Sequence, residues 1–291
     1  MNRQRNETIA ILTYIGSALV FGTIGIFRRY IPVSSAFLAF SRGILGGLFV
    51  MAYIKIRNKG SFKDIPHQKL LWLIISGAVM GINWMLLFEA YNHTTVAIAT
   101  LCYYMQPTIL ILLSPILFRE NLTKKKAVCA AVAVLGMVMV SGILGGSSNS
   151  QGNNLYGVLL GLGAACFYAG VIIINKKVEG IDPYPKTMIQ LLSAGITMIP
   201  YMLITNSFGS FPNDLRTLLL LLIVGLVHTG ITYVLYFGSM EHLRTQTVAI
   251  LGYIDPVSAL FFSAILLKEP LSMYNIIGAV LIIGSALISE I

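Results

Sequence analysis

Residues 88–122 have the sequence FEAYNHTTVAIATLCYYMQPTILILLSPILFRENL, and residues 237–271, FGSMEHLRTQTVAILGYIDPVSALFFSAILLKEPL, align with them without a gap. The offset is 149 residues in a chain of 291, and both copies lie in long apolar runs. The identical pairs are Phe88 and Phe237, His93 and His242, Tyr104 and Tyr253, Pro107 and Pro256, Ser114 and Ser263, Ile116 and Ile265, Leu117 and Leu266, Glu120 and Glu269, and Leu122 and Leu271. Two fused halves of similar length are typical of transporters built from internal repeats. The sequence therefore predicts a duplicated membrane protein.

The composition also indicates a membrane protein. The chain is 56% hydrophobic and 11% charged, with a mean hydropathy of +0.81, so a water-soluble fold would lack the polar residues to cover its surface. A helix needs roughly 20 apolar residues to cross the hydrocarbon of a bilayer, and continuous runs of this length are too long for barrel strands. We therefore expect an all-α membrane protein with ten transmembrane helices, near 8–27, 34–54, 70–91, 94–118, 124–143, 155–175, 184–204, 216–237, 245–267 and 272–289.

The duplication extends over five helices in each half. The segment GSALVFGTIGIF at 16–27 resembles GAACFYAGVIII at 163–174, outside the strongest stretch. Because five is an odd number, the second half must enter the membrane from the opposite side. We predict two inverted five-helix repeats, 1–144 and 155–291, joined by an outer linker at 145–154 that contains no Lys or Arg. Such repeats are typical of alternating access around a central site.

Charge placement predicts the orientation. With both termini placed in the cytoplasm, fifteen Lys and Arg residues fall on inner segments and four, Arg28, Arg29, Arg216 and Lys268, fall outside. The net charge of +9 then follows from topology and from contact with anionic lipid, and it gives no reason to expect nucleic-acid binding. The first run is too long for a signal peptide and lacks a cleavage site. We expect a multi-pass protein of a bacterial or archaeal plasma (inner) membrane.

Each half ends in a helix with a central proline, an acidic residue at a tight turn, and a further apolar helix. The two versions are MQPTILILLSPILFRENL at 105–122 and IDPVSALFFSAILLKEPL at 254–271. This arrangement resembles the EamA-like family of the drug/metabolite transporter superfamily, and the resemblance covers nearly the whole chain. It implies a fold of two five-helix repeats and the export of amino acids, metabolites or drugs, without indicating which substrate is moved.

Pro107 and Pro256 each remove a backbone hydrogen bond near the middle of the membrane. Each is either a packing kink or a hinge whose freed carbonyl faces a substrate cavity, since unpaired backbone in a bilayer is tolerated where it lines a cavity. Glu120 and Glu269 fall at helix ends. Inverted topology places them on opposite sides, so we expect them to act as caps or anchors of gate loops.

Charged residues inside the apolar runs are few. A mid-membrane charge costs at least about 2.5–3.5 kcal/mol, so it usually faces a partner or a water-filled path. Arg42 lies in the second run and Asp255 in the ninth, where the repeat partner Gln106 is neutral. Arg42 could bind the carboxylate of a zwitterion and Asp255 its ammonium, or the two could form a permanent ion pair. His228, in the eighth run, is either a packing residue or a proton relay, and Asp255 is a second candidate proton site.

Aromatic and amide residues complete the predicted binding site. They lie several residues inside their runs, away from the interfacial belts of Trp and Tyr, and their rings could stack on a substrate or a cation. The residues predicted to bind substrate are Arg42, Asn83, Trp84, Tyr103, Tyr104, Gln106, Tyr168, Gln190, His228, Tyr233, Tyr253 and Asp255, and the predicted hinges are Pro107 and Pro256.

No motif indicates an enzyme. The chain has no His-Glu-x-x-His, no Gly-x-Ser-x-Gly and no paired intramembrane aspartates, and Cys102, Cys129 and Cys166 lack metal-binding spacing. We expect no metal or cofactor. Without a nucleotide-binding loop, transport would be driven by an ion gradient, with protons as a candidate coupling ion, or run downhill. The expected function is secondary transport of a small polar or amphipathic metabolite, foremost an amino acid. The alternatives are an exporter of drug-like or cationic compounds and a lipid-translocating or receptor-like protein.

Overall fold

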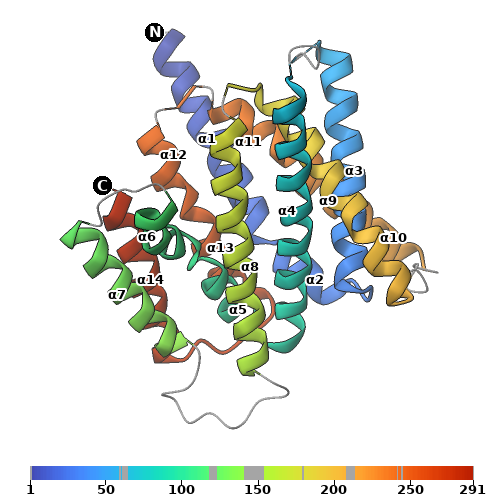
Figure 1. The fold of residues 1–291 in the computed structure, drawn as a ribbon. Coiled ribbons are helices and arrows are strands. Elements are labelled where there is room, and N and C mark those ends of the chain that lie inside the picture. Colours follow the sequence, from blue (N-terminus) through green and yellow to red (C-terminus); the bar gives the residue numbers. More distant parts are fainter. Residues whose placement is uncertain are drawn as a thin grey trace.

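The computed structural model describes residues 2–58, 60, 65–117, 123–140, 154–178, 180–207, 214–240, 242–243 and 245–290. Within these ranges the chain is helical and contains no strand (Figure 1). Glu120 and nearly all of the predicted linker lie outside the described residues.

Every predicted apolar run contains at least one helix. The first half contains α1 (Asn2–Gly22), α2 (Ile24–Tyr30), α3 (Ser35–Arg57), α4 (His67–His93), α5 (Val96–Tyr103), α6 (Gln106–Leu117) and α7 (Lys124–Val140). The second half contains α8 (Asn154–Asn175), the 3₁₀ turn η1 (Lys176–Val178), α9 (Pro183–Ile204), α10 (Leu215–Leu222), the π-helix η3 (Ile223–Ile231), α11 (Thr232–Met240), α12 (Thr245–Gly252), α13 (Ile254–Leu266) and α14 (Met273–Glu290).

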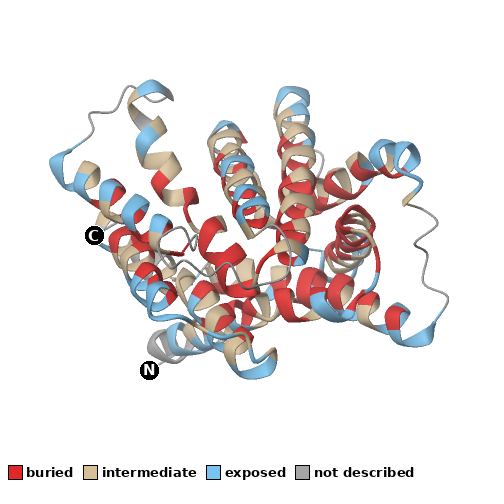
Figure 2. Ribbon diagram, turned by 90° about the horizontal axis from the view of Figure 1, so that it is seen from below, coloured by how far each residue is buried: buried red, intermediate tan, exposed pale blue. Residues whose placement is uncertain are grey.

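Seven segments of the described chain are long and apolar enough to cross a membrane, and Ile254–Leu266 and Met273–Ser289 are shorter apolar helices. Large apolar side chains such as Leu12, Ile204 and Val280 are exposed, and Figure 2 shows that buried residues gather on the inward faces of the helices. A surface of this kind suits lipid rather than water. The prediction of an all-α membrane protein is confirmed, whereas the count of ten spans and their inverted arrangement stay predictions.

The predicted proline-containing helices are interrupted just before their prolines. α5 ends at Tyr103 and α6 begins at Gln106, and in the second half the break falls at Tyr253, between α12 and α13. Pro107 and Pro256 consequently lie in the first turn of α6 and α13, where a missing N–H leaves no helical hydrogen bond unmade. Each predicted hinge therefore follows a break between two helices and does not kink a continuous one.

Close helix packing holds the centre of the bundle together. α3 packs against α9 and the π-helix, and α4 packs against α8 and α9. At the α3–α9 crossing, a Cβ added to Gly43 would lie only 2.6 Å from the backbone nitrogen of Gly195. Small residues permit such backbone approach, which is a principal source of helix association in membranes.

Candidate functional site

A cavity of about 730 Å³ lies inside the bundle, with residues of α1, α3, α4, α5, α6, α8, α11 and α13 on its wall. It extends to Asn175 and Met240, where α8 and α11 end, and to Lys126 in the first turn of α7. We call this the near end of the bundle. The far end is the opposite one, where α2 and α4 end and α5 begins. Among the described lining residues, the charged side chains are Arg42, Lys126 and Asp255.

The side chain of Arg42, on α3, is held in place by contacts along one edge and on one face of its guanidinium group. Nε donates a hydrogen bond of 2.8 Å to Oγ1 of Thr229 on the π-helix, and the guanidinium carbon lies 4.2 Å from the ring centroid of Trp84. Thr229 Oγ1 in turn donates to the carbonyl of Val224, five residues earlier, at 3.0 Å. Within the described part of the chain, neither Nη group of Arg42 has a hydrogen-bond acceptor. The two Nη groups of Arg42 are thus available to a ligand.

Asp255 lies in the first turn of α13, and its Oδ2 accepts a hydrogen bond of 2.6 Å from the hydroxyl of Tyr104. Its other carboxylate oxygen has no donor among the described residues. The ion pairs that join two described residues are Arg29–Glu269 and His93–Glu89. A permanent ion pair between Arg42 and Asp255, one of the two predicted arrangements, is therefore absent from this conformation.

Tyrosine rings form much of the remaining wall. Tyr103 packs against Tyr104 and Tyr168, with ring centroids 5.6 Å and 5.3 Å apart. Tyr233 of α11 meets Phe21 of α1 edge to face at 5.2 Å. Such a wall offers large apolar area together with hydroxyl groups, which suits an amphipathic ligand.

Nine of the twelve predicted binding residues line this cavity. They are Arg42, Trp84, Tyr103, Tyr104, Gln106, Tyr168, Tyr233, Tyr253 and Asp255. The predicted hinge Pro107 also lines it, whereas Pro256 is buried beside it. The structure thus brings together residues from both halves of the chain, and their roles in binding stay predictions.

The other three predicted residues lie outside the cavity wall and connect helices. Asn83 Nδ2 donates to a backbone carbonyl of α8 at 2.6 Å, and Gln190 Nε2 donates to Ser76 Oγ at 2.7 Å and to Asn175 Oδ1 at 2.8 Å. His228 Nε2 lies 2.7 Å from the hydroxyl of the threonine between α1 and α2. These contacts place the three side chains between helices, one layer behind the cavity wall.

Sequence reasoning missed several lining residues, among them Tyr14, Phe21, Tyr91 and Tyr236. Tyr236 follows Tyr233 by three residues, so helical spacing could have placed it on the same face. No comparable signal marks Tyr14, whose hydroxyl donates to the hydroxyl of Tyr236 at 3.1 Å across the bundle. The described residues contain no group of three or more His, Cys, Asp or Glu side chains that could hold a metal ion.

Comparison with known families gives a match over both halves. The model of the EamA-like transporter family matches residues 8–142 and again residues 155–290. An uncharacterised transporter of Bacillus subtilis, YxxF, is 28% identical over 283 residues, which cover 96% of this chain and 88% of that protein. The sequence resemblance to this family is thereby confirmed.

Other relatives carry more specific names. A probable amino-acid metabolite efflux pump of Escherichia coli is 31% identical over 206 residues, covering 67% of this chain and 68% of that protein. Its counterpart in Salmonella typhimurium is 30% identical over 203 residues, covering 66% of each chain. A solved crystal structure aligns with a TM-score of 0.64 at 19% identity, over 97% of this chain and 96% of that one, which shows a shared fold.

Proposed function

Because the chain belongs to the EamA-like transporter family, we propose that it is a secondary transporter of small zwitterionic metabolites, with amino acids and related compounds as its substrates. The observation that carries the proposal is the presence of two opposite charges, Arg42 and Asp255, among the residues that line one cavity. Arg42 offers two unpaired Nη groups, and Asp255 offers a carboxylate oxygen beside the one that Tyr104 occupies. Charge-assisted bonds to both ends of a zwitterion would offset the loss of its hydration.

The aromatic wall supports the same class of substrate. Tyr103, Tyr168 and Tyr233 would contact the apolar part of an amino acid while the charged ends bind at Arg42 and Asp255. A cavity of about 730 Å³ lies within the range of small-molecule sites. The relatives named as amino-acid metabolite efflux pumps favour export from the cytoplasm.

Alternating access between two inverted five-helix repeats is the proposed mechanism. The helix breaks at Tyr104 and Tyr253, 149 residues apart, support a repeated architecture. With both termini in the cytoplasm, the near end of the bundle is the inner end. The cavity in this conformation then extends toward the cytoplasm, and the far end is closed. Protons are the proposed coupling ion, with Asp255 as the exchanging group.

The test is a thermal-shift panel on the purified protein in lipid nanodiscs. Each L-amino acid is compared with its amide, which lacks the carboxylate, and with its N-acetyl derivative, which lacks the ammonium. We expect an amino acid to raise the Tm and both derivatives to lose that effect. Equal stabilisation by all three forms would contradict a zwitterion site.

Variants of Arg42 give the test its matched control. Arg42→Gln removes the charge and Arg42→Lys keeps it without the planar fork, so binding should weaken more in the first than in the second. Normal binding in both variants, with normal expression, would exclude Arg42 as a ligand for the carboxylate.

An exporter of cationic compounds is the second candidate. Asp255, surrounded by tyrosine rings, favours it, because carboxylates and aromatic faces both attract cations. In this case the amides, which carry a positive charge only, should stabilise the protein more than the parent amino acids do.

A further inference from the structure

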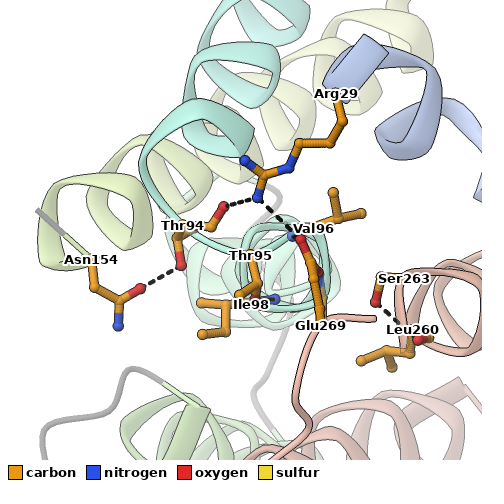
Figure 3. A network of polar contacts seen from close by, with 10 residues as sticks. Arg29, Thr94, Thr95, Val96, Ile98, Asn154, Leu260, Ser263 and Glu269 are labelled. Atoms are coloured by element: carbon orange, nitrogen blue, oxygen red, sulfur yellow. Dashed lines mark hydrogen bonds and ion pairs between the residues drawn. The ribbon is translucent and has the colours of Figure 1, made fainter. Parts of the chain in front are cut away.

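Glu269 connects segments from both halves at the far end of the bundle (Figure 3). Its Oε1 accepts hydrogen bonds from Arg29 Nη2 and from the backbone N–H of Val96, both at 3.1 Å, and its Oε2 accepts one from the N–H of Ala97 at 3.4 Å. Arg29 Nη2 also donates to the carbonyl of Thr94 at 2.8 Å. The Glu269 carboxylate thus joins the turn after α13 to the end of α2 and the start of α5, and Arg29 extends this network to the end of α4.

The surroundings of the Glu269 carboxylate strengthen its contacts with Arg29 and with the start of α5. The Glu269 side chain is 10% exposed and that of Arg29 is 34% exposed, so the pair is partly shielded from water. The first N–H groups of α5 lack helical acceptors and carry the positive end of the helix dipole. The backbone N–H of Glu269 donates to the carbonyl of Ser263 at 3.2 Å, which fixes the turn to α13.

The same two segments also meet inside the cavity. α5 leads to Tyr104, whose hydroxyl bonds Asp255 on α13, so α5 and α13 are joined at Glu269 and again at the site that would bind an ammonium. α2 closes tightly on the start of α5, since a Cβ on Gly25 would lie 2.3 Å from Val96 Cγ1. The cavity wall includes Ile24 and Thr100 but none of the residues that bond Glu269.

We propose that Arg29, Glu269 and the first N–H groups of α5 form a latch that keeps the far end of the cavity shut, and that the latch must break for substrate to exchange there. The proposal rests on the alternating-access function above. A ligand ammonium at the free carboxylate oxygen of Asp255 competes with the Tyr104 hydroxyl for this carboxylate and so weakens the second link between α5 and α13. Substrate binding and opening of the far end then both act on the contact between α5 and α13.

The experiment measures access to the cavity without any substrate. Thr100, on α5, is replaced by Cys in a protein whose native cysteines Cys102, Cys129 and Cys166 are replaced by Ala. A membrane-impermeant maleimide is then applied separately to each side of the membrane. In the parent, labelling should come from one side, the side of the near end.

Glu269→Gln and Arg29→Gln should each raise labelling from the opposite side about tenfold, the effect of about 1.4 kcal/mol on an opening equilibrium. The double variant should add little to either single change, because both single changes weaken the same contact between Arg29 and Glu269. Glu89→Gln is the matched control, since it removes the acid of the other ion pair, at the same end of the bundle, and should leave the rate unchanged.

Unchanged far-side labelling in Glu269→Gln, or an equal rise in Glu89→Gln, would overturn the latch. Because no substrate is added, a wrong substrate class leaves this result untouched. A reversed topology would exchange the two sides but keep the difference between parent and variant. Size-exclusion profiles of each variant confirm that altered labelling does not come from unfolding.

Discussion

A guanidinium group loses most of its hydration when a helix carries it into the interior of a membrane protein. Arg42 is 6% exposed, and it recovers part of this loss from Thr229 at Nε and from the face of Trp84. These contacts leave the two Nη groups facing the cavity. Thr229 therefore determines which edge of the Arg42 guanidinium group a ligand can contact.

Thr229→Val should weaken binding of the stabilising amino acid about tenfold, because it removes the acceptor of Nε while keeping the shape of the side chain. Thr229→Ser retains the hydroxyl and should bind within about twofold of the parent. Ligand-dependent fluorescence of Trp84, measured in a Trp72→Phe background, gives both affinities. Equal affinities in the two variants would show that Thr229 does not position Arg42.

Asp255→Asn tests coupling at a single residue. The amide cannot exchange a proton, so pH-driven accumulation in liposomes should be lost. Its carbonyl oxygen can still accept a hydrogen bond from the substrate ammonium, so exchange of substrate for substrate should continue with weaker binding. Full proton-driven transport in this variant would exclude Asp255 as the proton site. Loss of binding and exchange together would show that substrate binding requires the charge of Asp255, and it would leave the proton role of Asp255 without support.

At the scale of elements, the π-helix and the close helix crossings shape the site. π-helical turns are uncommon and are often found at functional sites. Here the π-helix of nine residues brings Thr229 to Arg42 and His228 to the break between α1 and α2. α3, which carries Arg42, is fixed between this π-helix and α9.

Gly43→Ala should lower the free energy of unfolding by about 1–3 kcal/mol, because the added Cβ would meet the backbone of α9 and force the two helices apart. Gly16→Ala is the matched control on α1, where nothing lies within 4 Å of the added Cβ. It should leave the unfolding free energy unchanged or raise it by up to about 1 kcal/mol. Thermal unfolding in detergent measures both, and similar losses in the two variants would contradict the packing argument.

At the scale of the whole molecule, topology decides which end of the cavity faces the cytoplasm. Single cysteines at Ser148 and Ser61, both outside the described residues, should be labelled from outside and inside respectively, in a background without native cysteines. The reason is the excess of Lys and Arg on the segments predicted to be inner. The reverse pattern would place both termini outside and would reverse the proposed direction of opening.

Features that depend on composition and repetition can be predicted from the sequence of this chain. Continuous apolar runs can bury their backbone in lipid only as helices, so the all-helical fold followed from hydropathy. The repeat at an offset of 149 indicated equivalent kinks or hinges at Pro107 and Pro256. Arg42 and Asp255 were found because a charge in an apolar run is costly and seldom lacks a function.

Which polar residues share the cavity, and which ones connect helices, depends on how the helices pack. Asn83, Gln190 and His228 match the cavity residues in polarity and in depth along their runs, and they differ only in the direction that each helix face takes after packing. Tyr14 reaches the site from α1 because α1 packs against α11 and α13, more than 200 residues away in sequence. Contacts between distant segments set how each helix is rotated about its own axis, and this rotation cannot be predicted from hydropathy.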